Sequence, residues 1–371
     1  MRWAPQQSAA LDAVRAWLAN PAGRPVFRLF GYAGTGKTTL ARHLADNESG
    51  RVCFAAFTGK AAKVMRDKGC RGASTIHSLI YDAERDETTG IFRYHLKRDQ
   101  DADINRAALV IVDECSMVGE KLGADLLSFK KPVLVLGDPA QLPAIDGGGY
   151  FTETAPDFML DEVHRQAAES PIIRIATDIR EARFDRQPAE FDGARILRKG
   201  DMNSEIVLAA DKVLIGTNRT RFSYNRRLRE LLGFSGDRPN VGETLICLRN
   251  DHSLGLLNGA IWDVAKVKRD RKTDAGRVFA FDLRDTDNPD RHVPARVYEH
   301  FFRGDAASLD WQAKRGTQEF DYGYAITVHK SQGSQWDSVC VFDEGGVFGP
   351  DRNRWLYTAV TRAAERLTLA I

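Results

Sequence analysis

Short apolar runs recur along the first 150 residues and alternate with stretches of helical periodicity. Four of them have the length and composition of β-strands: Val26 to Phe30, Arg51 to Phe57, Leu109 to Val112 and Val133 to Leu136. Nearly continuous apolar strands of this kind suit a parallel sheet that helices cover on both faces. The pattern therefore predicts an α/β domain over residues 1–155.

A polar stretch from Ser78 to Arg106 interrupts this first pattern between its second and third strands. Its centre, Arg85 to Gly90, has the composition of a turn. We expect residues 78–106 to form a β-hairpin inserted into the first domain.

A second α/β pattern covers residues 156–232 and 319–371. It contains a strand from Lys212 to Gly216 and a helix from Arg219 to Leu232, whose apolar side carries Phe222, Leu228, Leu231 and Leu232. Between the two pieces, residues 233–318 hold strand-like runs separated by Gly, Asn and Asp turns: Glu243 to Leu248, Ala260 to Lys268, Val278 to Leu283 and Val293 to Phe302. This alternation predicts a small all-β barrel inserted into the second domain.

Composition and charge describe an ordinary globular protein. The 371 residues are 43% hydrophobic and 28% charged, and 53 Lys and Arg against 51 Asp and Glu leave a net charge of +2. These values exclude wholesale disorder and collagen-like repeats. Because no apolar run approaches the roughly 18 residues of a membrane helix and the start lacks a signal-peptide core, we expect a cytoplasmic protein with no membrane partner. The five cysteines are scattered without a CxxC pair, which favours buried reduced thiols.

The strongest chemical signal is Gly31 to Thr38, GYAGTGKT, which follows an apolar strand and precedes the helical stretch Thr39 to Leu44. In a GxxxxGK[ST] loop, glycines allow backbone N–H groups to converge on phosphate. Lys37 is then expected to reach the β and γ phosphates of ATP, and the Thr38 hydroxyl to bind Mg²⁺. The predicted nucleotide-binding residues of this loop are Gly34, Thr35, Gly36, Lys37, Thr38 and Thr39.

Two further strands end in polar residues that suit hydrolysis. The strand Leu109 to Val112 ends in Asp113 and Glu114, at the edge of a parallel sheet where ligands bind. Most Asp-Glu pairs are solvated turns, but beside a phosphate loop Asp113 is expected to hold Mg²⁺ and Glu114 to take a proton from the attacking water. Gln141, after the strand Val133 to Leu136, is expected to sense the γ phosphate.

The order of these motifs along the chain resembles that of superfamily 1B helicases of the RecD/Dda-like group. Gln7 matches the adenine-reading glutamine of that family. The other matching stretches are Thr58 to Ala62, Thr75 to His77, Asp113 to Met117, Gly137 to Pro143, Arg165 with Gln166, Tyr324 to Gly333 and Tyr357 to Ala363.

The resemblance implies a fold and a set of catalytic residues. It implies two RecA-like P-loop domains in tandem, with the hairpin as a pin and the inserted barrel as an SH3-like domain. It also implies that Arg165 and Arg362 act as arginine fingers, and that Gly333 and Gln335 lie at the nucleotide. Two positions depart from the family: Phe57 replaces a common proline, and Gln335 replaces a glutamate that contacts ribose.

The resemblance further implies contacts to single-stranded DNA. The matching positions are Thr58, Lys60, Thr75, His77, Thr327, His329 and Lys330, with Thr217 and Asn218 as weaker candidates. Phe92 is a candidate for stacking on a base at the fork, and packing of the hairpin is the alternative role of this ring. His164 is a candidate for stacking on adenine, and an ordinary packed histidine is the alternative.

The motifs and the resemblance together predict an ATP- and Mg²⁺-dependent DNA helicase that acts at single-strand/duplex junctions. Its movement 5′→3′ on single strands is implied by the resemblance alone. We expect a monomeric motor, with single-strand-binding, recombination or replication proteins as candidate partners. Two other classes stay open: a DNA-stimulated ATPase subunit or switch that binds strands without unwinding, and a P-loop kinase. The balanced charge does not oppose DNA binding, because a motor that releases its strand in each cycle needs only a local track of contacts. Repair, recombination, replication and conjugation are all compatible pathways.

Overall fold

The computed structural model describes residues 3–85, 92–143, 149–163, 169–251, 253–286 and 288–371. Its contacts divide the chain into two compact units. The first unit contains residues 1–184 and 350–361, and the second contains residues 185–349 and 362–371. This division differs from the predicted domain limits for residues 156–184 and 350–361, which belong to the first unit.

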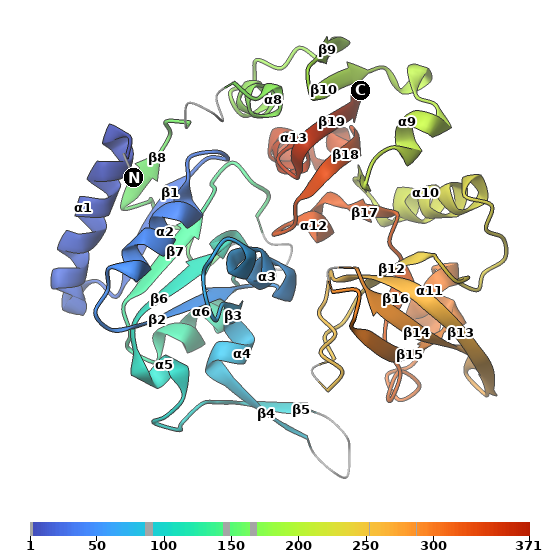
Figure 1. Cartoon of the computed structure of the whole chain (residues 1–371), viewed down its shortest axis with the longest axis horizontal. Coiled ribbons are helices and arrows are strands. Elements are labelled where there is room, and N and C mark those ends of the chain that lie inside the picture. The colour runs from blue at the N-terminus through green and yellow to red at the C-terminus, as the bar shows by residue number, and fades with distance from the viewer. Residues whose placement is uncertain (1–2, 86–91, 144–148, 164–168, 252, 287) are drawn as a thin grey trace. The chain divides into compact units, whose positions relative to one another are not determined.

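The first unit is built on a six-stranded sheet in which all pairs are parallel, in the order β3-β2-β6-β7-β1-β8 (Figure 1). Its strands are β1 (Val26–Gly31), β2 (Arg51–Ala56), β3 (Ser74–Thr75), β6 (Ala107–Asp113), β7 (Val133–Gly137) and β8 (Phe158–Leu160). The four predicted strands are confirmed. The predicted end of the first domain at residue 155 needs correction, because β8 pairs with the free edge of β1 and extends the sheet to Leu160.

Helices cover both faces of this sheet, as the apolar strands predicted. The described helices of the unit are α1 (Pro5–Ala19), α2 (Lys37–Asp46), α3 (Gly59–Asp67), α4 (Ile76–Ile80), α5 (Asp103–Arg106), α6 (Glu120–Leu127), α8 (Pro171–Arg180) and α13 (Arg352–Val360). One core packs Val14 and Leu40 against Leu136. The core on the opposite face packs Ile76 and Leu122 against neighbouring strand residues. Most residues of the central strands are therefore buried, and the sheet holds the loops at its carboxyl edge in place.

A hairpin is present in the first unit, but the predicted limits of 78–106 need correction, because residues 78–80 belong to α4 and residues 103–106 form α5. The hairpin consists of β4 (Tyr81–Arg85) and β5 (Phe92–Leu96), which pair antiparallel and extend away from α4 (Figure 1). The predicted turn, Arg85 to Gly90, falls almost wholly on residues 86–91, which lie outside the described residues. The role of the hairpin as a pin stays a prediction.

The second unit contains a six-stranded sheet in the order β17-β11-β18-β19-β10-β9. Its elements are β9 (Ala189–Phe191), β10 (Ala194–Leu197), α9 (Ser204–Leu208), β11 (Lys212–Ile215), α10 (Asn218–Leu231), β17 (Ala325–Thr327), α12 (Val328–Ser331), β18 (Trp336–Phe342) and β19 (Ala363–Ala370). The predicted strand and helix at β11 and α10 are confirmed. The placement of Leu232 on the apolar side of the helix is wrong, because α10 ends at Leu231 and leaves the Leu232 side chain 44% exposed.

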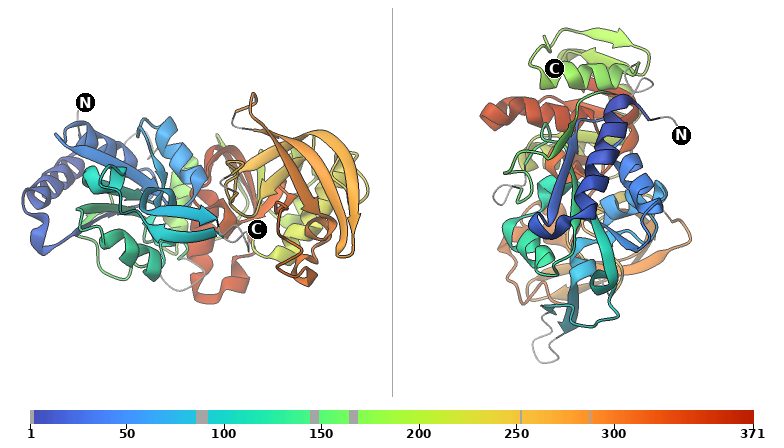
Figure 2. Two further views of the ribbon diagram at one scale, coloured as in Figure 1. Left: turned by 90° about the horizontal axis from the view of Figure 1, so that it is seen from below. Right: turned by 90° about the vertical axis from the view of Figure 1, so that its left-hand side faces the viewer.

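The insertion in the second unit is a five-stranded antiparallel sheet in the order β15-β14-β13-β12-β16, strongly twisted in Figure 2. Its strands are β12 (Thr244–Cys247), β13 (Ile261–Thr273), β14 (Gly276–Asp285), β15 (His292–Tyr298) and β16 (Phe320–Tyr322). Two limits need correction. Residues 299–302 belong to the helix α11 (Glu299–Arg303), which buries Phe301 and Phe302, and β16 lies past residue 318. The assignment to an SH3-like barrel stays a prediction.

The burial of the cysteines agrees with the sequence analysis. All five cysteines are free and buried, as predicted. Among the described helices, none has the length and apolar character to cross a membrane.

Candidate functional site

The phosphate loop joins β1 to α2 with the geometry that its glycines predict. Gly34 and Gly36 have φ values of 80° and 84°, a region that L side chains rarely adopt. Gly36 is also the N-cap of α2, and a Cβ atom there would lie 2.9 Å from Nε2 of Gln7. The loop thus exposes backbone N–H groups at the start of a ten-residue helix, an arrangement that binds phosphate.

Gln7 packs directly on this loop from α1. Its Nε2 donates to the carbonyl of Thr35 at 3.1 Å, and its Oε1 accepts from the Ala4 amide at 3.2 Å. The side chain is buried, and so is Thr35. The structure therefore places Gln7 beside the loop, and its contact with adenine stays a prediction.

Lys37 and Thr38 make the two contacts that define the loop's chemistry. Lys37 Nζ donates to the carbonyl oxygens of Gly31 at 2.6 Å and Tyr32 at 3.1 Å. The Thr38 hydroxyl donates to Oδ2 of Asp113 at 3.0 Å. One hydroxyl and one carboxylate oxygen are ligands that suit Mg²⁺. The pair predicted to bind the metal is thus brought together across 75 residues of sequence.

Glu114 occupies an unusual backbone conformation next to Asp113. Its φ is 52°, in the left-handed region, and its amide donates to Oδ1 of Asp113 at 2.8 Å. Such a conformation costs a non-glycine residue about 1–2 kcal/mol, and residues of this kind gather at active sites. The observation supports the catalytic role that the sequence predicts for Glu114.

Gln141 lies on the loop after β7 and is nearly buried. Among the described residues its Oε1 accepts no hydrogen bond. The neighbouring Asp138 is held by the Tyr357 hydroxyl, which donates to Oδ2 at 2.8 Å, while the same hydroxyl accepts from the Ala33 amide at 2.9 Å. Tyr357 therefore joins the phosphate loop to the loop that carries Gln141.

Neither Tyr357 nor Asp138 was singled out from the sequence as a site residue. Both lie in stretches that match the helicase motifs, and that position is the signal that would have found them. Arg180 is a further residue that sequence reasoning missed, with its guanidinium 3.6 Å from the centre of the Tyr32 ring. Arg180 and Tyr32 line a pocket of about 240 Å³. The other residues of its lining are Pro139, Ala140, Asn353 and Arg354.

Three of the other predicted nucleotide-site residues lie in the second unit, whereas the phosphate loop lies in the first. Gly333, Gln335 and Arg362 belong to the second unit, where Nη1 of Arg362 donates to the carbonyl of Ser334 at 3.2 Å. Thr39 lies in the first turn of α2. Arg165 lies outside the described residues, as do His164 and Gln166. The two arginine-finger assignments stay predictions.

The predicted DNA contacts of the first unit begin at the carboxyl ends of neighbouring strands. Thr58 follows β2 and caps α3, since its Oγ1 accepts from the Ala61 amide at 3.1 Å. Thr75 ends β3 and caps α4, since its Oγ1 accepts from the Ser78 amide at 3.0 Å. β2 and β3 pair directly, so both helix N-termini lie at one edge of the sheet. Lys60 belongs to the first turn of α3.

The second unit repeats this arrangement. Thr217 caps α10 through the Thr220 amide at 3.1 Å, and Thr327 precedes α12 at the end of β17. β11 and β17 pair with Ile215 opposite Thr327, so Thr217 and Asn218 start a helix at the same sheet edge. His329 and Lys330 lie in α12, and burial lowers the pKa of both side chains.

A row of aromatic side chains links the end of β2 to the hairpin. Ring centres lie 6.5 Å apart for Phe57 and His77, 5.7 Å for His77 and Tyr81, and 6.1 Å for Tyr81 and Tyr94. Tyr94 is 49% exposed. The side chain of Phe92, predicted to act at the fork, is outside the part of the structure that is described. Within the described part of the hairpin, Tyr94 is an exposed ring that the sequence analysis did not single out.

Two protein families match the chain in succession. The family described as AAA domain matches residues 3–201, and the UvrD-like helicase C-terminal domain matches residues 322–370. The structure is similar to that of a Pif1 helicase from Bacteroides in complex with ADP-AlF3 and ssDNA. Their TM-score is 0.60 at 18% identity, over all of this chain and 93% of that one. At this identity the similarity shows a shared fold.

Curated relatives match over most of this chain. The ATP-dependent RecD2 DNA helicase of Deinococcus radiodurans is 28% identical over 93% of the chain, and the RecBCD enzyme subunit RecD of Mycolicibacterium smegmatis is 26% identical over 91%. The chain spans 47% of the first relative's length and 67% of the second's. Because the AAA domain match covers more than half of its residues, the chain belongs to the AAA domain family, and its C-terminal part matches a UvrD-like helicase domain.

Proposed function

We propose that the protein is an ATP-dependent DNA helicase that moves 5′→3′ on single strands. The observation that carries this proposal is the hydrogen bond between Thr38 and Asp113, which assembles a metal-binding oxygen pair beside a phosphate loop. Glu114, the next residue, is the proposed base that acts on water near that pair. The relatives named as helicases support the extension from nucleotide hydrolysis to unwinding.

Each residue of the phosphate site has a defined task in this proposal. Mg²⁺, bound with ATP, supplies positive charge that stabilises the negative charge developing on the phosphates. Thr38 and Asp113 hold the metal, and Lys37 exchanges its loop carbonyls for phosphate oxygens. Glu114 accepts the proton of the attacking water. Tyr357 keeps the Ala33 amide and Asp138 in a fixed relation during this step.

Single-stranded DNA is the proposed substrate of the two sheet edges at which a threonine precedes each of two helices. Helix N-termini present amide hydrogens to anions, and hydroxyl groups contact phosphates without reading sequence. Each edge supplies a pair of adjacent N-termini, at Thr58 and Thr75 in one unit and at Thr217 and Thr327 in the other. The Pif1 structure with the same fold contains ssDNA, which supports this assignment.

Unwinding of tailed duplexes tests the function and its polarity. With ATP and Mg²⁺, we expect strand separation of a duplex that carries a 5′ single-stranded tail and none for the same duplex with a 3′ tail. Release of a labelled strand in the presence of a trap strand measures this. Equal or reversed preference would contradict the polarity, and DNA-stimulated ATP hydrolysis without separation would favour the binding switch.

The hairpin rings are expected to affect strand separation more than ATP hydrolysis. Replacing Tyr94 or Phe92 with alanine removes a ring that stacks on a base, a contact worth about 1–3 kcal/mol. We expect the unwinding rate to fall by about tenfold in each variant, with DNA-stimulated hydrolysis within twofold of wild type. Equal losses in both assays would show that the rings serve only to pack the hairpin.

A further inference from the structure

The buried face of α10 carries polar residues at every fourth position. Arg221, Asn225 and Arg229 recur with a spacing of four and therefore lie on one face of the helix. Asn225 is 2% exposed and Arg229 is 6% exposed. Apolar residues normally fill such a stripe, so each of these side chains needs polar partners.

Their first set of partners is the short segment that joins the inserted sheet to the main sheet of the second unit. Nδ2 of Asn225 donates to the carbonyls of Tyr322 at 3.1 Å and Ala325 at 3.0 Å, while its Oδ1 accepts from the Ala325 amide at 2.7 Å. Arg221 forms an ion pair with the buried Asp321 of β16. One side of α10 therefore holds this connection from β16 to the start of β17.

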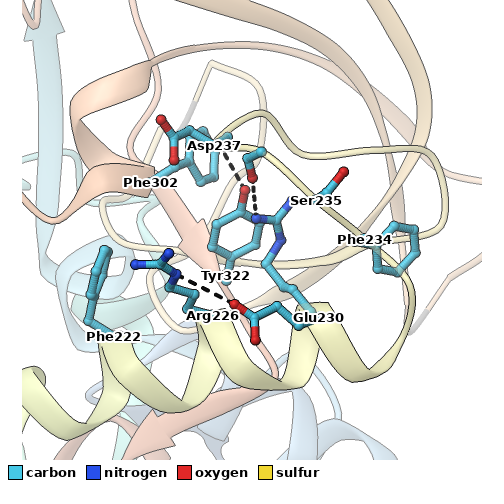
Figure 3. A pocket seen from close by; sticks show the side chains of 10 residues that line it. Phe222, Arg226, Glu230, Phe234, Ser235, Asp237, Phe302 and Tyr322 are labelled. Atoms are coloured by element: carbon cyan, nitrogen blue, oxygen red, sulfur yellow. Dashed lines mark hydrogen bonds and ion pairs between the residues drawn. The ribbon is translucent and has the colours of Figure 1, made fainter.

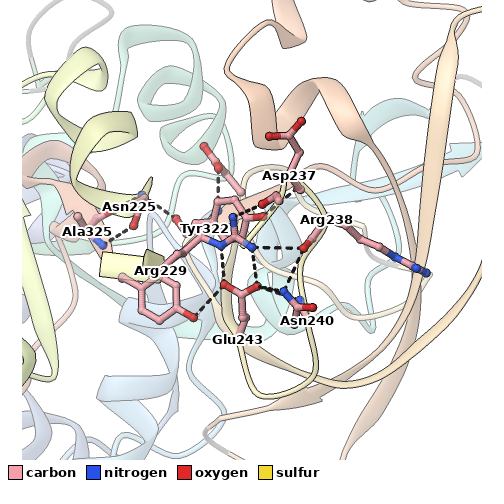
Figure 4. Close-up of polar contacts among 11 residues, drawn as sticks. Asn225, Arg229, Asp237, Arg238, Asn240, Glu243, Tyr322 and Ala325 are labelled. Atoms are coloured by element: carbon pink, nitrogen blue, oxygen red, sulfur yellow. Dashed lines mark hydrogen bonds and ion pairs between the residues drawn. The ribbon is translucent and has the colours of Figure 1, made fainter. Parts of the chain in front are cut away.

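The second set of partners is the other connection, between α10 and β12. Arg229 donates from Nε and Nη2 to the two carboxylate oxygens of Glu243, at 2.6 and 2.8 Å, and from Nη1 to the carbonyl of Gly236 at 2.6 Å (Figure 4). Glu243 also accepts from the Asn240 amide at 2.8 Å and the Tyr324 hydroxyl at 3.2 Å. Glu243 is fully buried. Arg229 thus anchors the second connection, and Tyr324 links it to the first.

The inserted sheet and the main sheet have separate apolar cores, and Tyr324 packs against both of them. A pocket of about 270 Å³ lies beside Arg229 and Tyr322, with Phe222, Phe234 and Phe302 in its walls (Figure 3). Beside this pocket, the polar contacts of α10 contribute to the attachment of the inserted sheet.

We propose that Arg221, Asn225 and Arg229 are positioning residues that latch both connections of the inserted sheet and thereby set the grip of the β17–α12 segment on single-stranded DNA. Asn225 holds both backbone groups of Ala325, two residues before Thr327. The register of β17 against β11, and with it the place of Thr327, His329 and Lys330, depends on that contact. The inserted sheet and the DNA-contacting segment then move as one body. The DNA part of this inference rests on the proposed function.

Two variants weaken the latch by different amounts. Tyr324→Phe removes one hydroxyl and keeps the ring, and Asn225→Ala removes the central amide. We expect the DNA concentration for half-maximal ATPase stimulation to rise about threefold in the first and about tenfold in the second. The rate at saturating DNA and the rate without DNA stay within twofold of wild type. Ser223→Ala, at an exposed position of α10, is the matched control and leaves all three values unchanged.

Hydrogen–deuterium exchange supplies a readout that needs no DNA. We expect faster amide exchange at residues 320–331 and 233–243 in both variants and no change in the strands of the first unit. An unchanged half-saturating concentration, or a loss of saturated rate equal to the loss of affinity, would overturn the latch. Unchanged exchange would overturn it too. If DNA does not stimulate ATP hydrolysis by the wild-type protein, the proposed function is refuted. The exchange measurement would still show whether α10 holds the two connections.

Discussion

Replacing Lys37 with alanine is expected to reduce ATP hydrolysis by about 10³-fold. Lys37 is the cation of the phosphate loop, and Nζ already points at the loop, bonded to the carbonyls of Gly31 and Tyr32. Alanine removes the charge that would stabilise the β and γ phosphates, and it leaves the two sheet edges intact. Steady-state phosphate release with saturating single-stranded DNA measures the loss.

Binding of a labelled single strand separates this effect from misfolding. We expect the dissociation constant without nucleotide to stay within twofold of wild type, and the thermal unfolding midpoint to fall only slightly. Lys68→Ala replaces an exposed lysine at the end of α3 and is the matched control, with wild-type hydrolysis expected. Hydrolysis at the wild-type rate in Lys37→Ala would remove the assignment of the phosphate loop.

Local patterns were sufficient for the strands and the phosphate loop. Val26–Gly31 and Ala107–Asp113 are nearly continuous apolar runs with all or most of their side chains buried, so neighbouring residues carry the signal. Glycines at positions 34 and 36 indicate left-handed backbone conformations, and the loop has them at both positions. The limits of the strands indicate which residues lie at the carboxyl edge of the sheet. For this reason Thr38 and Asp113 could both be predicted as Mg²⁺ ligands from the sequence.

The buried face of α10 could not be identified in the same way. Arg221, Asn225 and Arg229 look like the solvent side of an amphipathic helix, and Leu232 looks like its apolar side. The partner that reverses this interpretation for Asn225 is the segment around Ala325, 100 residues away in sequence. Periodicity reports the polarity of a face, and only the tertiary partners decide whether a polar face is buried.

Contacts of long sequence separation also explain why the Tyr357 bridge was missed. Its hydroxyl meets Ala33 across 324 residues and Asp138 across 219 residues. A tyrosine within a helical stretch carries no sign of such partners. Burial raises the pKa of Tyr357, so its hydroxyl keeps its proton and can donate to the Asp138 carboxylate throughout the physiological range.

Replacing Arg229 with methionine is expected to lower the free energy of unfolding of the second unit by about 3–5 kcal/mol. The substitution keeps most of the apolar stem and removes both guanidinium donors to Glu243, whose carboxylate is fully buried. A buried charge that loses its counterion bears the full penalty of desolvation. The carbonyl of Gly236 loses a donor as well. Urea unfolding followed by circular dichroism and by exchange in residues 233–243 measures the loss.

The double variant Arg229→Met with Glu243→Met tests whether the loss in free energy of unfolding comes from the buried Glu243 carboxylate that has lost its counterion. With both charges gone, no unpaired buried charge remains at positions 229 and 243, and we expect the double variant to recover at least about half of the stability lost in Arg229→Met. Arg227→Met is the matched control, since Arg227 is an exposed residue of the same helix whose pairing with Glu230 at 3.2 Å contributes less than about 1 kcal/mol. A double variant less stable than Arg229→Met would mean that Glu243 stabilises the unit through Asn240 and Tyr324 even without its arginine. If the double variant recovers its stability but binds single strands more weakly, the main role of the ion pair is to position the β17–α12 segment.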